Sequence, residues 1–373
     1  MSKVYKTNFS RGCFHHWSES KAIAEYISNW LDSDGEQSYE FGEDYLTLTN
    51  KGIRVSNKLL MMGMSDKRGD DTKRGFFGVG SCQALVVLTD LNYEVSISND
   101  DVLWNASFEH CDNFDEDVLV VTETPQQSTG NFSVRISGLT EDILEEVKQR
   151  CLVFQNREVL FSTKYGDVIE NGEDQGEVFC GDMYVCENNG FKYSYNFKPK
   201  VLPLNQDRNA VNNWDLKVLT AKIWKVCPDK DLLMDAVKSK REDCSLVMDS
   251  WCVGRDKLSV SEQFGEEYLT ENPNTIVTSD FSEYESHVKR GNKVKYLDNS
   301  NQVKSIKESD AYQNMINSFT IIEEESKETR LHTIREALQS YVDDNSGNDE
   351  IYEGKTLQDH LDELESIIDN EIY

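Results

Sequence analysis

Three segments between Lys21 and Leu85 constrain this chain more strongly than any other part of its sequence. Residues 21–33 (KAIAEYISNWLDS) place apolar side chains three and four residues apart, as an amphipathic helix does. Residues 46–56 (LTLTNKGIRVS) alternate like a half-buried strand and then reach a glycine turn. Residues 63–85 pass from a polar stretch into a glycine-rich turn and an apolar helix. Because such a turn offers N–H groups and a positive helix end to phosphates, the sequence predicts a nucleotide pocket here.

Three polar residues of the first helix, Glu25, Asn29 and Asp32, are three or four positions apart and form one stripe. A polar stripe usually faces water, but Asn29 lies between Ile27 and Trp30 in the most apolar part of the helix. Asn is a poor helix former, so a functional role would explain its presence at this position. A carboxylate can take a proton from an attacking water, and a carboxamide oxygen is a hard ligand for magnesium.

The same residues match in full the E-x-x-x-N-x-x-D motif of the GHKL superfamily (gyrase, heat-shock chaperone, histidine kinase, MutL), which the chain resembles. The resemblance implies a Bergerat ATP-binding fold with ATP and Mg²⁺ as ligands. It implies Glu25 as the general base, Asn29 as a magnesium ligand, and Asp32 as a contact to the nucleotide or to its immediate surroundings. The glycine-rich turn matches the superfamily's G-x-x-G-x-G motif, which implies nucleotide contacts from Gly75, Gly78, Val79 and Gly80.

The superfamily's second motif, D-x-G-x-G, aligns with residues 50–54 (NKGIR), where Asn50 stands for the Asp and Arg54 for the second Gly. The Asp of that motif accepts a hydrogen bond from the amino group of adenine. Asn is nearly isosteric with Asp and keeps one carbonyl acceptor. The resemblance therefore implies nucleotide contacts from Asn50 and Gly52, and it leaves adenine selectivity open.

Two further contacts are implied by the resemblance alone. In the polar segment that corresponds to the superfamily's lid, Ser65 and Lys67 occupy the region of its Ser-x-Lys pair. Many members complete the site with a basic residue from a later segment, which would be Arg208 or Lys200 here. The alternative for these cations is a surface ion pair with a nearby aspartate, which is common in proteins.

Composition limits the partners of the chain. Its formal net charge of -29 opposes contact with phosphate backbones, so direct nucleic-acid binding over a broad face is not expected. No apolar run approaches the length of a membrane span, and no secretory signal is visible at the N-terminus. The nine cysteines contain no C-x-x-C pair, which suits reduced thiols in the cytoplasm.

Part of the charge is local to the last residues of the chain. Residues 307–373 contain 18 Asp and Glu against 5 Lys and Arg, which is 13 of the 29 net negative charges. An acidic tail of this kind is typically a solvated helical surface. The other interpretation is a surface that docks a protein partner or mimics nucleic acid.

The strand and helix patterns, together with the resemblance, predict an α+β fold. We expect a Bergerat-type α/β sandwich, with a mostly antiparallel sheet and helices on one face, then a small α/β region and an acidic helical tail. The expected domains are 1–226 (core 15–140, continuation 141–226), 227–306 and 307–373.

Within these domains, residues 1–20 have no clear pattern and are expected to be irregular. Four segments with period-2 alternation predict an antiparallel meander, namely 93–98, 102–108, 118–123 and 131–137. A small β-α-β unit is expected from 275–278, 283–289 and 293–297.

The leading hypothesis is a magnesium-dependent ATPase in which ATP closes the lid at 63–74 and changes an interface with a protein partner or within a homodimer. The second hypothesis is a protein that holds nucleotide without turnover, or that inhibits a host or nucleic-acid enzyme through its acidic surface. A structural scaffold with no nucleotide is the third.

Overall fold

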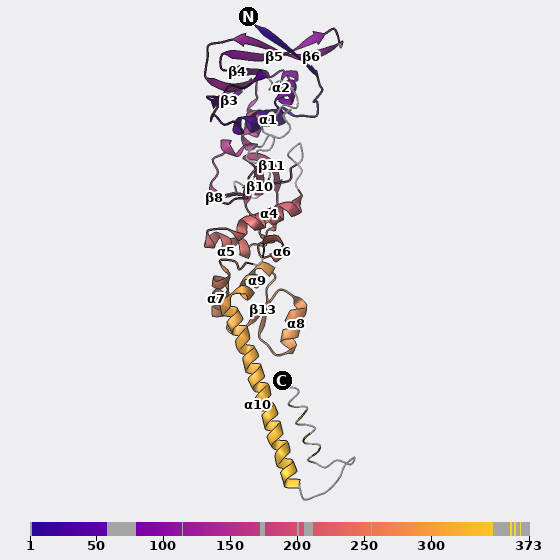
Figure 1. The fold of residues 1–373 in the computed structure, drawn as a ribbon, viewed down its shortest axis with the longest axis vertical. Helices are drawn as coiled ribbons and strands as arrows, with labels where there is room; N and C mark the ends of the chain where they lie inside the picture. The colour runs from indigo at the N-terminus through magenta and orange to yellow at the C-terminus, as the bar shows by residue number, and fades with distance from the viewer. Residues whose placement is uncertain are drawn as a thin grey trace. The chain divides into compact units, whose positions relative to one another are not determined.

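The computed structural model describes residues 2–57, 80–113, 115–171, 176–199, 201–204, 212–254 and 256–345, with Asp359, Asp362 and Ser366. The chain divides into two compact units, residues 1–254 and 255–373 (Figure 1). The boundaries expected at 226 and 306 stay predictions. The expected lid at 63–74 lies outside the described residues.

In the described part of the first unit, a seven-stranded sheet has the order β1-β6-β5-β4-β7-β3-β2. Every neighbouring pair is antiparallel. The strands are β1 (Lys3–Ser10), β2 (Glu36–Phe41), β3 (Tyr45–Lys51), β4 (Glu94–Asn99), β5 (Val102–Cys111), β6 (Glu116–Pro125) and β7 (Asn131–Ser137).

In the described part of the first unit, three helices contribute buried apolar side chains to the core of this sheet. They are α1 (Glu19–Leu31), α2 (Gly80–Asp90) and α3 (Glu141–Gln149). Figure 1 shows α1 and α2 together on one side of the sheet, and their apolar residues share one core with the inward residues of β3, β4 and β7. The expected α+β class, with a mostly antiparallel sheet and helices packed on it, is confirmed.

The sheet corrects two expectations. The meander holds for β4, β5 and β6, but β7 pairs with β4 and β3 instead of β6. Residues 3–10, which the sequence predicts to be irregular, form the edge strand β1, paired with β6. The pattern of β1 is hard to recognise because Phe9 is its single buried residue.

Helix α1 forms for reasons that are visible in its sequence. The hydroxyl of Ser18 accepts a hydrogen bond from the backbone N–H of Lys21 at 3.3 Å and so caps the first turn. The helix ends at Leu31, where Asp32 is the C-cap. Five large or apolar residues on one side are buried, namely Ala22, Ile23, Tyr26, Ile27 and Trp30.

The first unit continues with a second sheet, in the order β11-β10-β12-β9-β8. Its strands are β8 (Val159–Ser162), β9 (Gly166–Ile169), β10 (Gly176–Cys180), β11 (Met183–Asn188) and β12 (Ser194–Phe197), of which β10 and β12 run parallel. The helices α4 (Asn213–Lys225), α5 (Lys230–Lys238) and α6 (Ser250–Val253) follow.

A buried carboxylate joins this second sheet to the segment after α5. Asp243 accepts hydrogen bonds from the backbone N–H groups of Lys192 (3.0 Å) and Tyr193 (3.1 Å) and from the hydroxyl of Tyr195 (2.7 Å). The indole N–H of Trp224 in α4 donates to the same hydroxyl at 2.8 Å. The network satisfies the polar groups that the sheet buries here, and it ties α4 to β12.

The second unit contains α7 (Ser261–Glu271), β13 (Ile276–Thr278), α8 (Phe281–Lys289), β14 (Val294–Tyr296), α9 (Ser300–Glu308) and α10 (Asp310–Asn345). Strands β13 and β14 are parallel, so the expected β-α-β unit is present. The hydroxyl of Tyr312, at the start of α10, accepts a hydrogen bond from the N–H of Val277 in β13 at 2.9 Å. No described helix is both long and apolar enough to cross a membrane.

Candidate nucleotide site

The polar stripe of α1 faces the first turn of α2. The amide nitrogen of Asn29 donates to the hydroxyl of Ser81 at 3.0 Å and to the backbone oxygen of Glu25 at 2.8 Å. The hydroxyl of Tyr26 donates to the backbone oxygen of Ser81 at 3.4 Å. These contacts place the candidate magnesium ligand and the candidate base beside the last glycine of the glycine-rich motif, Gly80.

Gly80 is needed for this approach. A Cβ atom at this position would lie 2.1 Å from the Oε2 atom of Glu25 and 2.9 Å from its Cδ atom. Any larger side chain would therefore displace the carboxylate from the helix start. The glycine leaves the half-buried carboxylate of Glu25 packed directly against the N-terminal end of α2.

The electrostatics of this end favour negative charge. The first N–H groups of a helix have no partner within it, and the aligned peptide dipoles make this end positive. The first turn of α2 contains no acidic side chain of its own. The N-terminal end of α2 can therefore stabilise the carboxylate of Glu25, which would then have a structural role. It can also hold a phosphate group, beside which Glu25 would have a chemical role.

Two neighbouring groups are held neutral by burial. Burial raises the pKa of Tyr26 far above its usual range, so its hydroxyl remains a donor. Burial likewise raises the pKa of Cys82 to about 11, although it lies in the first turn of α2, where the helix end favours the thiolate. Cys82 is therefore a packing residue and not a nucleophile.

Asn50 lies at the end of β3, beside the C-terminal end of α1. It is 3% exposed, and its amide nitrogen donates to the backbone oxygen of Trp30 at 3.0 Å. The indole of Trp30 in turn donates to the backbone oxygen of Thr49 at 3.0 Å. One N–H of Asn50 is used at the helix end, and the acceptor that Asn50 can offer to a ligand is its side-chain oxygen. Asp32, at the end of the same helix, is also buried.

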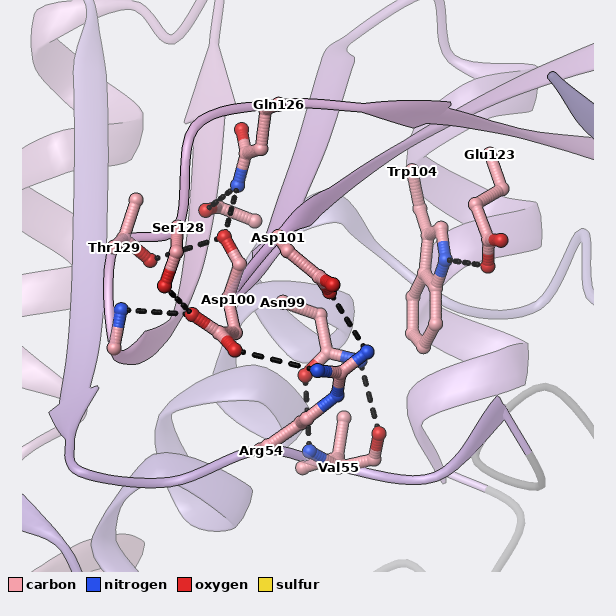
Figure 2. A network of polar contacts seen from close by, with 12 residues as sticks. Arg54, Val55, Asn99, Asp100, Asp101, Trp104, Glu123, Gln126, Ser128 and Thr129 are labelled. Carbon is pink, nitrogen blue, oxygen red and sulfur yellow. Dashed lines mark hydrogen bonds and ion pairs between the residues drawn. The ribbon is translucent and has the colours of Figure 1, made fainter. Parts of the chain in front are cut away.

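The segment after Asn50 turns at Gly52, whose φ of +71° lies in the left-handed region that favours glycine. Its N–H donates to the backbone oxygen of Gly130 at 3.0 Å. Arg54, which stands where the superfamily has a second glycine, forms ion pairs with Asp100 at 3.3 Å and Asp101 at 2.7 Å (Figure 2). Arg54, the residue that departs from the motif, therefore has its ion-pair partners in the turn between β4 and β5.

The structure thus brings Glu25, Asn29 and Gly80 together, and it places Asn50 and Asp32 at the end of α1. Other candidate residues lie outside the described part of the chain, and their assignments stay predictions: Ser65, Lys67, Gly75, Gly78, Val79, Lys200 and Arg208. Sequence patterns alone assign no role to Ser81 or to Asn99. The position of Ser81 directly after the last motif glycine is the signal that points to it.

Comparison with known proteins gives a match to one family model and matches to solved structures. A family model described as the Mycoplasma pneumoniae MPN635 N-terminal domain matches residues 142–230, which include the second sheet and none of the candidate site residues on α1, β3 and α2. Two structures of the Saccharomyces cerevisiae topoisomerase II ATPase region, one of them bound to ICRF-187 (dexrazoxane), are similar at 10% identity. Each match covers 51% of this chain and 76% of that chain, with a TM-score of 0.35. No curated protein matches the chain.

Proposed function

We propose that the first domain binds ATP with Mg²⁺ and hydrolyses it. The observation that carries the proposal is the convergence of Glu25 and Asn29 on the first turn of α2 at Gly80. Hydrolysis of a phosphoanhydride needs an acceptor for the proton of the attacking water, and it needs donors for the charge that develops on the phosphoryl group. A carboxylate on one helix and the N-terminal end of another supply these two requirements.

In this proposal Glu25 accepts the proton of the water. Asn29 uses its nitrogen to bind Ser81, which fixes its carboxamide, and its oxygen is the kind of hard donor that Mg²⁺ takes. Bound Mg²⁺ would neutralise charge on the phosphate oxygens. The start of α2 would hold the phosphates through its N–H groups.

Asn50 contacts the base in the same proposal. Its nitrogen donates to Trp30, so its oxygen is the atom to accept a hydrogen bond from an amino group such as that of adenine. Ser65, Lys67 and Arg208 would complete the site from the lid and from the later segment. Closure of residues 63–74, and the homodimer or partner interface that it would change, belong to the proposal as well.

The test is ATP hydrolysis and ATP binding by the Glu25→Gln variant. Gln keeps the shape of Glu but cannot accept the proton, so we expect kcat to fall about 100-fold or more while the Kd for Mg-ATP changes little. Glu145→Gln is the matched control, because this carboxylate is exposed on α3 and pairs with Lys148. Equal turnover by wild type and Glu25→Gln would reject the catalytic role of Glu25.

The second candidate is a protein that holds nucleotide without turnover, with Glu25 serving only to stabilise the start of α2. The packing of its carboxylate on that helix end is the observation that favours this role. It predicts tight Mg-ATP binding, no phosphate release by wild type, and a lower Tm for Glu25→Gln.

A role for the acidic tail needs a separate truncation. Removing residues from 307 onward would also remove Tyr312, which is 2% exposed and hydrogen-bonded to β13. Deleting residues 320–373 keeps that contact. Loss of partner capture or of inhibition in this truncated chain, with ATP binding unchanged, is expected if the tail is the docking surface.

A further inference from the structure

The segment that follows Asn50 is fastened to two neighbouring loops by a polar network around Arg54 and Asn99 (Figure 2). We call residues 52–55, Asn99 and Asp100 the clasp. We propose that the clasp positions the base-binding half of the nucleotide site and leaves the phosphate-binding half unaffected. This inference rests on the proposed function, because it assigns a part of the same site.

Asn99 makes the most specific contact of the clasp. Its side-chain oxygen accepts from the backbone N–H of Val55 at 2.9 Å, and its side-chain nitrogen donates to the backbone oxygen of Val55 at 2.9 Å. Asn99 is 3% exposed, so both polar groups of its amide are satisfied inside the protein. The side chain of Asn99 thus binds both the backbone N–H and the backbone oxygen of Val55.

The sheet register places this contact in line with Asn50. Asn50 of β3 is opposite Phe132 of β7, and Phe132 is also opposite Asn99 of β4. Directly opposed residues of an antiparallel sheet point to the same face, so all three side chains lie on one face in one row. The chain therefore leaves β3 after Lys51, crosses the end of β7, and contacts Asn99 of β4 through Val55.

Asp100 and Arg54 also fix the segment 52–55, through polar contacts closer to the solvent. Asp100 has a left-handed backbone (φ 59°), and its carboxylate accepts from the hydroxyl of Ser128 at 2.5 Å and from the N–H of Gly130 at 2.9 Å. The guanidinium of Arg54 pairs with that carboxylate at 3.3 Å. The N–H of Gly52 donates back to Gly130, so the loop between β6 and β7 closes the network.

These contacts have a consequence for binding. The backbone of Asn50 is paired with β2 and β7, and the clasp holds the segment directly after β3, which includes Gly52, the other residue expected to contact the nucleotide in this half of the site. Glu25, Asn29 and Gly80 make none of the described clasp contacts, because Glu25 and Asn29 face the first turn of α2, to which Gly80 belongs. Loosening the clasp should therefore weaken recognition of the base without weakening recognition of a triphosphate.

The experiment compares the affinities for Mg-ATP and for Mg-tripolyphosphate, which has the phosphates but no base. For Asn99→Ala we expect the Kd for ATP to rise about tenfold, which corresponds to about 1.4 kcal/mol, while the Kd for tripolyphosphate stays constant. Arg54→Ala keeps the buried contacts, since Arg54 is 57% exposed, and we expect a two- to fivefold rise at most, of about the size that exposed ion pairs allow.

Lys148→Ala is the matched control, because it removes an exposed ion pair with Glu145 on α3 and touches none of the described clasp contacts. It should leave both affinities unchanged. A purely structural role of Asn99 would lower Tm without changing the ratio of the two affinities, and that result overturns the clasp. ATP binding by wild type, with an unchanged ratio in both clasp variants, also overturns the clasp but keeps the proposed function. Wild type that binds neither ligand overturns both.

Discussion

Replacing Gly80 by Ala separates the chemistry of the candidate site from its stability. The new Cβ would lie 2.1 Å from the Oε2 atom of Glu25, whereas ordinary contact begins at 3.4 Å. The carboxylate must therefore move by more than about 1 Å, and a misplacement of that size can lower turnover about 100-fold. The atom that must move is the end of a flexible side chain, so the clash itself should cost little stability.

The backbone contribution has the opposite sign. Gly80 is the first residue of α2, and Ala is favoured over Gly in helices by up to about 1 kcal/mol. We expect a Tm equal to or slightly above that of wild type, together with a large fall in kcat. Steady-state phosphate release and thermal unfolding measure the two properties on the same preparation.

Gly12→Ala is the control substitution, and it should lower stability without changing turnover. Gly12 has a φ of +73°, and beyond its chain neighbours no described atom lies within 4 Å of the place that a Cβ would take, so Ala there is strained but meets no obstacle. It should lose about 1 kcal/mol of stability and keep full turnover. Turnover by Gly80→Ala within about threefold of wild type would refute the role given to Glu25.

Three other outcomes follow from the described contacts. Asp243→Asn should lose about 2 kcal/mol in urea unfolding, because one carboxylate oxygen becomes an NH2 group that faces the backbone N–H of Lys192 or of Tyr193 and leaves that donor unpaired. The pKa of Glu123 is lowered, mainly by the hydrogen bond from the indole of Trp104. The carboxylate therefore stabilises the fold above its unfolded pKa, and this stabilisation is lost as pH falls through the folded pKa. Glu123→Gln should therefore make the free energy of unfolding less dependent on pH below about pH 5. Iodoacetamide at neutral pH should spare Cys82 in the folded protein, because its thiol is buried and its pKa is about 11, and mass spectrometry of labelled peptides tests this.

Local patterns predict those elements whose reasons are local. Helix α1 has a cap at Ser18 and an apolar stripe, and both are within its own sequence. The strands β4, β5 and β6 follow one another through short turns, so their antiparallel pairing needs no distant information. The β-α-β unit of the second part of the chain is equally local.

The missed elements depend on distant partners. Strand β1 pairs with β6 across more than 100 residues, and one buried side chain is too little to show a strand pattern. Strand β7 enters the sheet between β4 and β3, which no period in its sequence encodes. Asn99 and Asp100 resemble an ordinary turn in the sequence, and the charge of Arg54 at a motif glycine is the sign that this turn has a partner.

The two halves of the candidate site meet at consecutive residues of α1. The side chain of Asn29 binds Ser81 of α2, where the phosphates are expected, and the backbone oxygen of Trp30 binds Asn50 of β3, where the base is expected. Each half has its own support, Gly80 for one and the clasp for the other. Under the proposed function, we therefore expect affinity for a triphosphate and selectivity for a base to be separable, so that single substitutions remove them one at a time. Both should be lost together only when the packing of α1 itself is disturbed.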